Sequence, residues 1–284
     1  MVWGLNWPVM KLGVTGFPPL SFRAISMWLG LPVLWALLRW QRVPFAIRRA
    51  DWAELAKLSL TNMIIWHVVA ILAIQALSSG RAAILGYTMP IFSALWGVAL
   101  FGERLQPRHL AGIAAAAAGV ALLLWHEFGA LTGRPLAALG MLFAAAVWAL
   151  GTQQMRRTTI QAPTLAIVFW MTLASTLVLT AGTVLFERHR WIPPLPATWG
   201  AIAYNALLIF GFAQAIWMMM ARNLPPIASS MSVMMIPVLG VVSGAWWLNE
   251  ELHWQDGAAI VLVLLAIATV LLPARRGTQP VEPA

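Results

Sequence analysis

Long apolar runs alternate with short polar or charged segments along the whole chain. A helix that crosses about 30 Å of hydrocarbon needs roughly 20 mostly apolar residues. Dividing the chain at its charges, prolines and glycines gives ten such runs, of which the first is short. The pattern therefore predicts an all-α integral membrane protein. Its ten transmembrane helices are predicted at residues 1–14, 20–38, 58–76, 82–101, 109–125, 135–155, 164–186, 199–221, 226–248 and 256–273.

The composition supports a lipid environment. Hydrophobic residues make up 61% of the 284 residues and charged residues only 10%, whereas a soluble domain carries about 25% charged residues. So few polar side chains cannot cover a water-exposed globule, which argues against a soluble enzyme. The net charge of +9 is spread between apolar runs, so we expect no nucleic acid among the partners. The chain has no cysteine, and we expect no metal site and no cofactor.

The basic residues predict the topology, because Lys and Arg near helix ends favour the cytoplasmic side. With ten helices and both termini in the cytoplasm, four basic residues fall outside, at Arg81, Arg134, Arg188 and Arg190. Two more, Lys11 and Arg23, lie within predicted helices. The remaining twelve fall inside: Arg39, Arg42, Arg48, Arg49, Lys57, Arg104, Arg108, Arg156, Arg157, Arg222, Arg275 and Arg276.

Landmarks in the first half of the chain recur in the second half at an offset of 145 to 147 residues. Because five predicted helices make one unit, the second unit enters the membrane from the opposite face, which produces inverted repeats. We expect one repeat at 1–125, a second at 135–273 and a disordered cytoplasmic tail at 274–284. The matched landmarks are Trp3 with Trp148, Lys11 with Arg156, Pro90 with Pro237, and Glu103 with Glu250.

One set of residues is typical of a known family. It comprises Trp3, Gly4, Asn6, Lys11, Arg23, Pro90, the run Gly102-Glu103-Arg104-Leu105 and Gly112, with a weaker second copy. In these residues the chain resembles the drug/metabolite transporter superfamily with two EamA domains. The resemblance implies a ten-helix inner-membrane carrier, often an exporter of amino acids or other small metabolites, such as the YddG-like exporters. The second copy departs from the first, with Asn249 in place of Gly102 and Val168 near the position that matches Arg23.

Polar side chains within the predicted helices are candidates for substrate contacts, because burying them in lipid is costly. His67 lies near the middle of the third helix, beside Trp66, and Gln214 follows 147 residues later. They either line a substrate cavity or form interhelical hydrogen bonds that serve packing. Asn62, Gln75 and Tyr87 would join the same lining.

Lys11 and Arg23 lie toward the outer halves of the first two predicted helices. Together they could receive a substrate carboxylate, or each could extend its charged end to the membrane interface. Glu103 and Glu250 end the fourth and ninth helices, where capping or pairing with Arg104 or Arg108 is favoured over catalysis.

Pro90 and Pro237 lie in the middle of the fourth and ninth predicted helices. Each removes an N–H donor and so frees the carbonyl four residues earlier, on Gly86 and Val233. Interrupted helices at matching positions are typical of transporter binding sites, although a static bend would also fit.

Tryptophan dominates the aromatic residues, with 17 Trp against two Tyr. The deeper tryptophans either stack on an apolar substrate or pack between helices; they are Trp66, Trp96, Trp148, Trp170 and Trp217. Those at predicted interfaces are expected to anchor the protein in the membrane; they are Trp40, Trp52, Trp191, Trp199, Trp246, Trp247 and Trp254. Methionines flank the eighth-to-ninth connection, either to repack during substrate passage or to fill gaps; they are Met218, Met219, Met220, Met231, Met234 and Met235.

The sequence therefore favours a secondary carrier that exports a small metabolite. All nine carboxylates lie at helix ends or in loops, so proton coupling would require His67 or Lys11, and facilitated diffusion is equally compatible. The alternatives are an integral-membrane enzyme acting on lipid, for which no catalytic motif is present, and a passive pore or structural subunit, which the repeat disfavours. The expected partners are a small-molecule substrate and the lipid bilayer, with a monomer or a homodimer both open.

Overall fold

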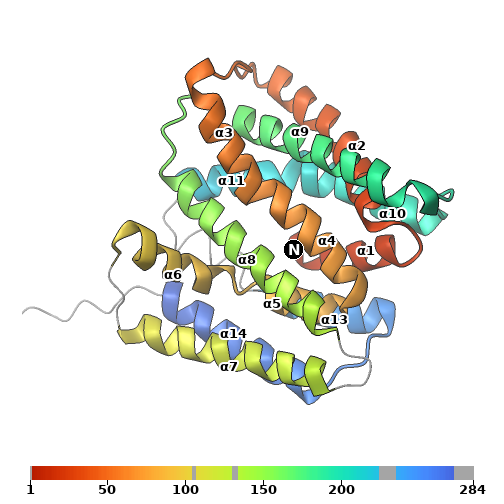
Figure 1. Cartoon of the computed structure of the whole chain (residues 1–284), viewed down its shortest axis with the longest axis vertical. Coiled ribbons are helices and arrows are strands. Elements are labelled where there is room, and N and C mark those ends of the chain that lie inside the picture. Colours follow the sequence, from red (N-terminus) through yellow and green to blue (C-terminus); the bar gives the residue numbers. More distant parts are fainter. Residues whose placement is uncertain (1, 104–106, 130–133, 224–234, 272–284) are drawn as a thin grey trace, which may run out of the picture.

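The computed structural model describes residues 2–103, 107–129, 134–223 and 235–271. The predicted tail at 274–284 lies outside these residues, as do Val233, Met231 and Met234. The described part is all-helical and contains no strand. Its α-helices are α1 (Val2–Thr15), α2 (Pro19–Trp40), α3 (Trp52–Ser59), α4 (Ile65–Ala76), α5 (Ser79–Gly86), α6 (Met89–Phe101), α7 (Pro107–Gly129), α8 (Pro135–Arg156), α9 (Thr164–Gly182), α10 (Pro196–Tyr204), α11 (Gln214–Asn223), α13 (Ile236–Leu248) and α14 (Trp254–Leu271) (Figure 1).

Several of these helices join end to end into longer runs. A π-helical turn, η2 (Leu60–Ile64), connects α3 to α4, and a second, η5 (Asn205–Ala213), connects α10 to α11. A third π-helical turn, η3 (Thr183–Glu187), extends α9. Six runs are long and apolar enough to cross a membrane: Pro19–Trp40, Arg49–Ala76, Ser79–Phe101, Pro135–Arg156, Thr164–Arg190 and Pro196–Met220. Shorter apolar helices span Leu110–Leu123, Ile236–Leu248 and Trp254–Thr269.

The helical run that begins at Arg49 shows where a prediction from apolar runs differs from the structure. The sequence predicts a helix over 58–76, but the helical backbone starts nine residues earlier. The added segment contains α3, whose Glu54 and Lys57 are polar residues on an amphipathic helix. A helix continues past the hydrocarbon boundary wherever its backbone hydrogen bonds continue, so charged residues mark the membrane edge rather than the helix end.

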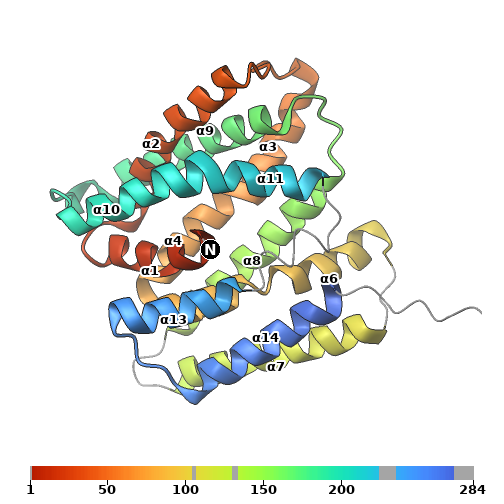
Figure 2. The same cartoon turned by 180° about the vertical axis from the view of Figure 1, so that it is seen from behind.

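The helices lie roughly side by side, and most connections fall at two opposite ends of the bundle (Figures 1 and 2). The α2–α3 and α8–α9 connections lie at one end, called here the α2–α3 end. The α1–α2, α9–α10 and α13–α14 connections lie at the opposite end, called here the α9–α10 end. The main packing partners are α2 with α9 and η5, α8 with α4 and α6, α13 with α1 and α5, and α7 with α14.

Large apolar side chains cover much of the outside of the bundle. Leu136 is 83% exposed, and Leu185 and Phe143 are also exposed. Water-soluble proteins rarely expose contiguous apolar surface on this scale, whereas lipid-facing helices require it. The tryptophans expected at the interfaces are exposed as well: Trp40, Trp52, Trp191, Trp199, Trp246, Trp247 and Trp254. The bundle is thus built to be solvated by a bilayer.

Candidate functional site

Buried polar side chains from α2, α4 and the η5–α11 run meet in the interior of the bundle. Arg23 Nη1 donates to Asn205 Oδ1 at 3.1 Å. The ring of Phe210 contacts both Arg23 and His67, with its centroid 5.5 Å from Arg23 Cζ and 5.1 Å from the imidazole centroid. Gln214, which follows η5 directly, is fully buried and its Nε2 lies 3.3 Å from Met63 Sδ. We call Arg23, His67, Asn205 and Gln214 the central polar cluster.

The central polar cluster contains several polar atoms that have no hydrogen-bond partner among the described residues. They are Arg23 Nε, both ring nitrogens of His67, and Gln214 Oε1. Nearby helices add Asn6 Oδ1 and Asn62 Oδ1. Buried polar groups in proteins are nearly always hydrogen-bonded, so unpaired groups gathered in one region indicate a place that accepts water or a polar ligand.

Arg23 is the exceptional member of the cluster. It is 2% exposed, and in the described part of the chain it forms no ion pair with a carboxylate. Its remaining contact is a bond from Nη2 to Met10 Sδ at 2.6 Å. A buried guanidinium is normally paired with an anion, and its planar fork fits a carboxylate with two parallel hydrogen bonds. Arg23 can therefore bind an anionic group supplied by a ligand.

Aromatic rings continue from the cluster toward α1 and α5. Trp148 lies 6.5 Å from His67 and 5.3 Å from Trp66, measured between ring centroids. Trp7 then contacts Trp66 at 6.5 Å and Tyr87 at 6.3 Å. The three tryptophans are buried. Edge-to-face rings of this kind form an apolar wall beside the polar cluster.

Lys11 does not join Arg23. Its ammonium donates to the carbonyls of Ile74, Gln75 and Leu77, at 3.1, 3.0 and 2.7 Å. These are the last carbonyls of α4 and the residue that follows it, which lack intrahelical partners and carry the negative end of the helix dipole. With all three donors engaged, Lys11 holds the end of α4 and leaves no free N–H for a carboxylate.

The two prolines expected within helices stand at the starts of new ones. Pro90 lies in the first turn of α6 after a break at Tyr87 and Thr88, and Pro237 lies in the first turn of α13. A Cβ added to Gly86 would lie 2.8 Å from a ring carbon of Trp7. The broken backbone at Gly86 therefore lies directly against the aromatic wall.

Glu103 and Glu250 have matching backbone geometry. The residues before them, Gly102 and Asn249, have φ of 67° and 52°. These left-handed residues end α6 and α13, and each following amide then donates back along its helix, from Glu103 to the Gly97 carbonyl at 3.0 Å and from Glu250 to the Gly244 carbonyl at 3.4 Å. A Cβ on Gly97 or Gly244 would lie 2.3 or 2.6 Å from the glutamate carboxylate.

The described partners of these two glutamates lie far from them in the sequence. Glu103 pairs with Arg157 at 2.5 Å. The Arg104 and Arg108 side chains lie outside the described residues. Glu250 accepts from the amides of Ser79 and Gly80, at 2.7 and 3.2 Å, and so caps α5 rather than the helix that follows it in sequence. Glu250 thus stabilises a helix start and Glu103 forms an ion pair, and neither carboxylate has a hydrogen bond or ion pair to the central polar cluster among the described residues.

A comparison with protein families assigns the chain. The sequence model of the EamA-like transporter family matches residues 1–125 and 135–272. The chain belongs to the EamA-like transporter family. It is therefore a multi-pass membrane transporter and not an enzyme, and the resemblance to the drug/metabolite transporter superfamily is confirmed.

Curated EamA-like relatives match over nearly the full length. The uncharacterized inner membrane transporter YedA of Escherichia coli K12 is 27% identical, covering 99% of this chain and 92% of the relative. The uncharacterized transporter YoaV of Bacillus subtilis is 25% identical, covering 94% and 90%. A probable amino-acid metabolite efflux pump of E. coli K12 is also 25% identical, covering 94% and 90%. A crystal structure of a protein 23% identical, covering 96% of both chains with a TM-score of 0.72, shares the fold.

Two residues that contact Arg23 were not among the candidates predicted from the sequence. Asn205 supplies the oxygen that Arg23 binds, and the ring of Phe210 contacts both Arg23 and His67. One signal was available, since Asn205 is an asparagine in an apolar run of the eighth predicted helix, as Asn62 is in the third. Phe210 carried no such signal, because one phenylalanine among apolar residues does not indicate which helix face it occupies.

Proposed function

We propose that this chain is a secondary carrier that exports amino acids or similar small metabolites across the inner membrane by alternating access. The observation that carries the proposal is the buried Arg23, which has no carboxylate partner in the described part of the chain and lies in a cluster of unpaired polar atoms. A relative named as a probable amino-acid metabolite efflux pump supports the substrate class. One substrate carboxylate on Arg23 would supply the missing counter-charge.

Ten transmembrane helices in two inverted five-helix repeats, at 1–125 and 135–273, are part of the proposal. The packing supports it, because a contact between two helices recurs between the two helices that correspond to them in the other repeat. Helix α1 packs on α13 as α8 packs on α6, and α2 packs on η5 as α9 packs on η2. The π-helical turns η2 and η5 interrupt corresponding runs. π-helical turns in helices are frequent at functional sites.

The proposed orientation places both termini and the α2–α3 end in the cytoplasm. Many of the basic residues expected inside belong to the connections and helix ends at this end, including Arg39, Arg48, Arg157 and Arg222. There Arg48 donates to both oxygens of Asp51, at 2.9 and 3.1 Å, which raises the pKa of Arg48. The excess of positive charge at one end fits the preference of Lys and Arg for the cytoplasmic side.

The proposed substrate cavity combines a polar surface with an apolar one. Arg23 binds the carboxylate, and His67, Gln214 and Asn62 offer further polar contacts. Trp66, Trp148 and Tyr87 supply the apolar wall, and the break before Pro90 allows α5 and α6 to reorient, while Pro237 lies at the start of α13. Lys11 contributes by holding the end of α4. An amphipathic metabolite, charged at one end and apolar at the other, matches this arrangement.

Uptake into proteoliposomes of purified protein tests the proposal. The panel pairs radiolabelled amino acids with neutral metabolites of similar size, with and without an imposed pH gradient. Saturable uptake with mutual competition is the expected result. Flux that rises linearly with concentration would instead indicate a pore, and no flux for any compound in tight vesicles would contradict the amino-acid assignment.

The pH gradient also separates the two coupling mechanisms. No carboxylate in the described part of the chain forms a hydrogen bond or ion pair with the central polar cluster, so the usual acidic proton relay is missing there. We therefore propose facilitated transport, and expect the gradient to leave uptake unchanged. Accumulation driven by the gradient would assign the coupling proton to His67.

A further inference from the structure

The α1–α2 and α8–α9 connections occupy corresponding places at opposite ends of the bundle (Figure 1). Pro18 precedes α2 and Pro163 precedes α9, with nearly the same backbone angles: φ −57° and ψ 129° against φ −56° and ψ 142°. One carboxylate binds residues of the α8–α9 connection, and another binds residues in the first turn of α2. Glu54 accepts from Thr158 and Thr159, and Glu187 accepts from Leu20 and Ser21. The two ends are alike in this respect.

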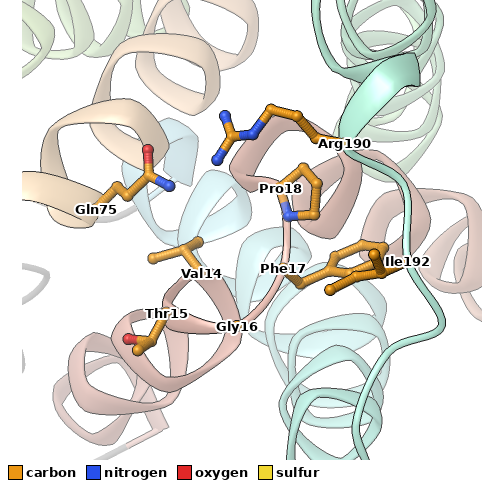
Figure 3. A pocket seen from close by; sticks show the side chains of 8 residues that line it. All are labelled: Val14, Thr15, Gly16, Phe17, Pro18, Gln75, Arg190 and Ile192. Atoms are coloured by element: carbon orange, nitrogen blue, oxygen red, sulfur yellow. The ribbon is translucent and has the colours of Figure 1, made fainter.

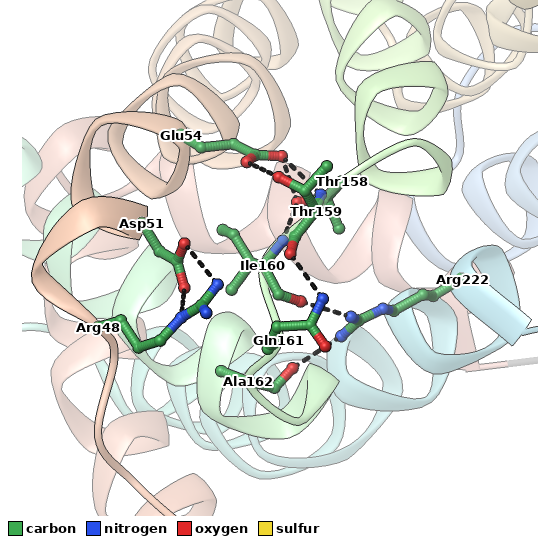
Figure 4. Close-up of polar contacts among 9 residues, drawn as sticks. All are labelled: Arg48, Asp51, Glu54, Thr158, Thr159, Ile160, Gln161, Ala162 and Arg222. Atoms are coloured by element: carbon green, nitrogen blue, oxygen red, sulfur yellow. Dashed lines mark hydrogen bonds and ion pairs between the residues drawn. The ribbon is translucent and has the colours of Figure 1, made fainter.

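At the α2–α3 end an arginine adds a second attachment. Arg222, near the end of α11, donates to the carbonyls of Ile160 and Ala162 at 2.8 and 2.9 Å (Figure 4). It also donates to the Thr164 hydroxyl at 3.1 Å. These acceptors span the α8–α9 connection and the first residue of α9. A guanidinium that reaches three acceptors with charge-assisted bonds fixes both the position and the orientation of the connection.

At the α9–α10 end the corresponding residue is Gln75, which lies 147 residues before Arg222. Its amide forms no hydrogen bond to the α1–α2 connection among the described residues, and a cavity of about 350 Å³ lies there instead (Figure 3). The cavity is lined by Val14, Thr15, Gly16, Phe17, Pro18, Gln75, Arg190 and Ile192. The side chain of Gln75 is shorter than that of arginine and neutral, and it does not bind the α1–α2 connection in the described part of the chain. Arg222 does bind the corresponding α8–α9 connection.

We propose that Arg222 is a positioning residue that keeps the α2–α3 end of the transporter closed, while the α1–α2 connection at the other end lacks this additional attachment and moves more easily. The inference rests on the proposed alternating access, because one end must open for a substrate to pass. Breaking the Arg222 contacts shifts the population toward conformations open at the α2–α3 end. Placing an arginine at position 75 attaches the opposite connection.

The absence of cysteine from the chain makes a labelling experiment direct, because any introduced thiol is unique. Ala166→Cys reports on the α2–α3 end, since Ala166 is fully buried in the first turn of α9. Val14→Cys reports on the α9–α10 end, since Val14 is 1% exposed and lines the cavity. The rate of reaction with a membrane-impermeant maleimide is measured without substrate, on the full chain in proteoliposomes.

We expect Arg222→Gln, which copies the side chain at position 75, to raise the labelling rate at position 166 about tenfold without raising it at position 14. Arg222→Lys keeps the positive charge but not the planar guanidinium. We expect it to give a labelling rate at position 166 between those of the wild type and Arg222→Gln. Arg39→Gln, which removes an exposed arginine at the same end, leaves both rates unchanged. Gln75→Arg lowers the rate at position 14 and tests the inference even where Arg222→Gln fails to fold.

Two outcomes overturn the inference. One is unchanged labelling at position 166 in a folded Arg222→Gln protein. The other is equal acceleration at both positions, which would indicate general destabilisation. Because the labelling requires no substrate, it is independent of the flux assay: absent flux with asymmetric labelling contradicts the proposed function, and flux with symmetric labelling contradicts the role of Arg222.

Discussion

The contact of α2 with η5 and the contact of α9 with η2 correspond to each other but carry different chemistry. In the first, Arg23 donates to Asn205 Oδ1, and Asn205 Nδ2 donates back to the Ala201 carbonyl at 3.0 Å. In the second, Asn62 makes the same backward bond to the Leu58 carbonyl at 3.2 Å, but its Oδ1 is unpaired. Val168 lies where the repeat would place a second arginine.

In the proposed repeat, this difference places a buried cation in one half and not at the matching position of the other. The π-helical turn and its asparagine occur in both halves, so they belong to the shared architecture. The cation occurs only in the first half. Two arginines would make the cavity a symmetric site with a high cost of buried charge, whereas one defines a single orientation for a carboxylate.

The largest effect is expected for Arg23→Gln, which removes the cation that distinguishes the first half from the second. Transport of carboxylate substrates should fall about 10- to 100-fold, as expected for loss of charge-assisted hydrogen bonds, while neutral substrates lose less. The measurement is initial uptake of paired acidic and neutral compounds into proteoliposomes. Arg188→Gln, which alters an exposed arginine at the α9–α10 end, serves as the control. Equal losses for both classes of compound would remove the carboxylate assignment.

A second prediction concerns the close packing of α2 on η5. A Cβ at Gly30 would lie 2.7 Å from Phe210 Cβ and 3.0 Å from the Ala206 carbonyl oxygen. Gly30→Ala should therefore destabilise the protein by about 1–3 kcal/mol and lower its Tm by several degrees. Gly140→Ala is the matched control, because its nearest contact, Val69 Cγ1, is 3.5 Å away. Thermal denaturation in detergent compares them, and equal Tm values would argue against a tight α2–η5 contact.

A smaller and more selective effect separates the two asparagines. Asn205→Ala removes the acceptor that orients Arg23, and should raise KM for carboxylate substrates about 2- to 10-fold. Asn62→Ala should affect acidic and neutral substrates alike, since no cation contacts its oxygen. Steady-state uptake gives both KM values. A selective loss in Asn62→Ala would mean that the second half also recognises the carboxylate.

The smallest effects are expected at His67 and Gln214. His67→Ala and Gln214→Ala should lower flux by about threefold without unfolding the protein, because neither His67 nitrogen nor Gln214 Oε1 has a protein hydrogen bond to lose. Flux at matched protein levels is the measurement. Wild-type rates in both variants would favour a packing role for these two residues.

How much the sequence could predict depends on the range of each interaction. The apolar runs each overlap a helix because a lipid-exposed backbone has few other ways to satisfy its hydrogen bonds. Arg23, His67 and Gln214 stood out as polar residues in apolar runs; all three are buried, and Arg23 and His67 both contact Phe210. The break near Pro90 was also predictable, because proline restricts the backbone locally.

Long-range partners were not predictable. Lys11 binds carbonyls more than 60 residues away, and Glu250 caps a helix that begins 171 residues earlier. Nothing in the local sequence names such partners, because they depend on how the helices pack. The pairing of Gly97 with Glu103, and of Gly244 with Glu250, did leave a signal, since both pairs have the same spacing and recur at the offset of 147.

The unpaired charge of Arg23 has an electrical consequence. With a carboxylate bound, the guanidinium and the substrate group neutralise each other; in the empty carrier the full positive charge remains within the membrane field. Moving one elementary charge across that field changes its energy by about 2.3 kcal/mol per 100 mV. Under the proposed function, a substrate with a net charge of −1 cancels the charge of Arg23, so the membrane potential acts on the return of the empty carrier more than on the passage of the loaded one, and voltage becomes a driving variable for the transport of such a substrate.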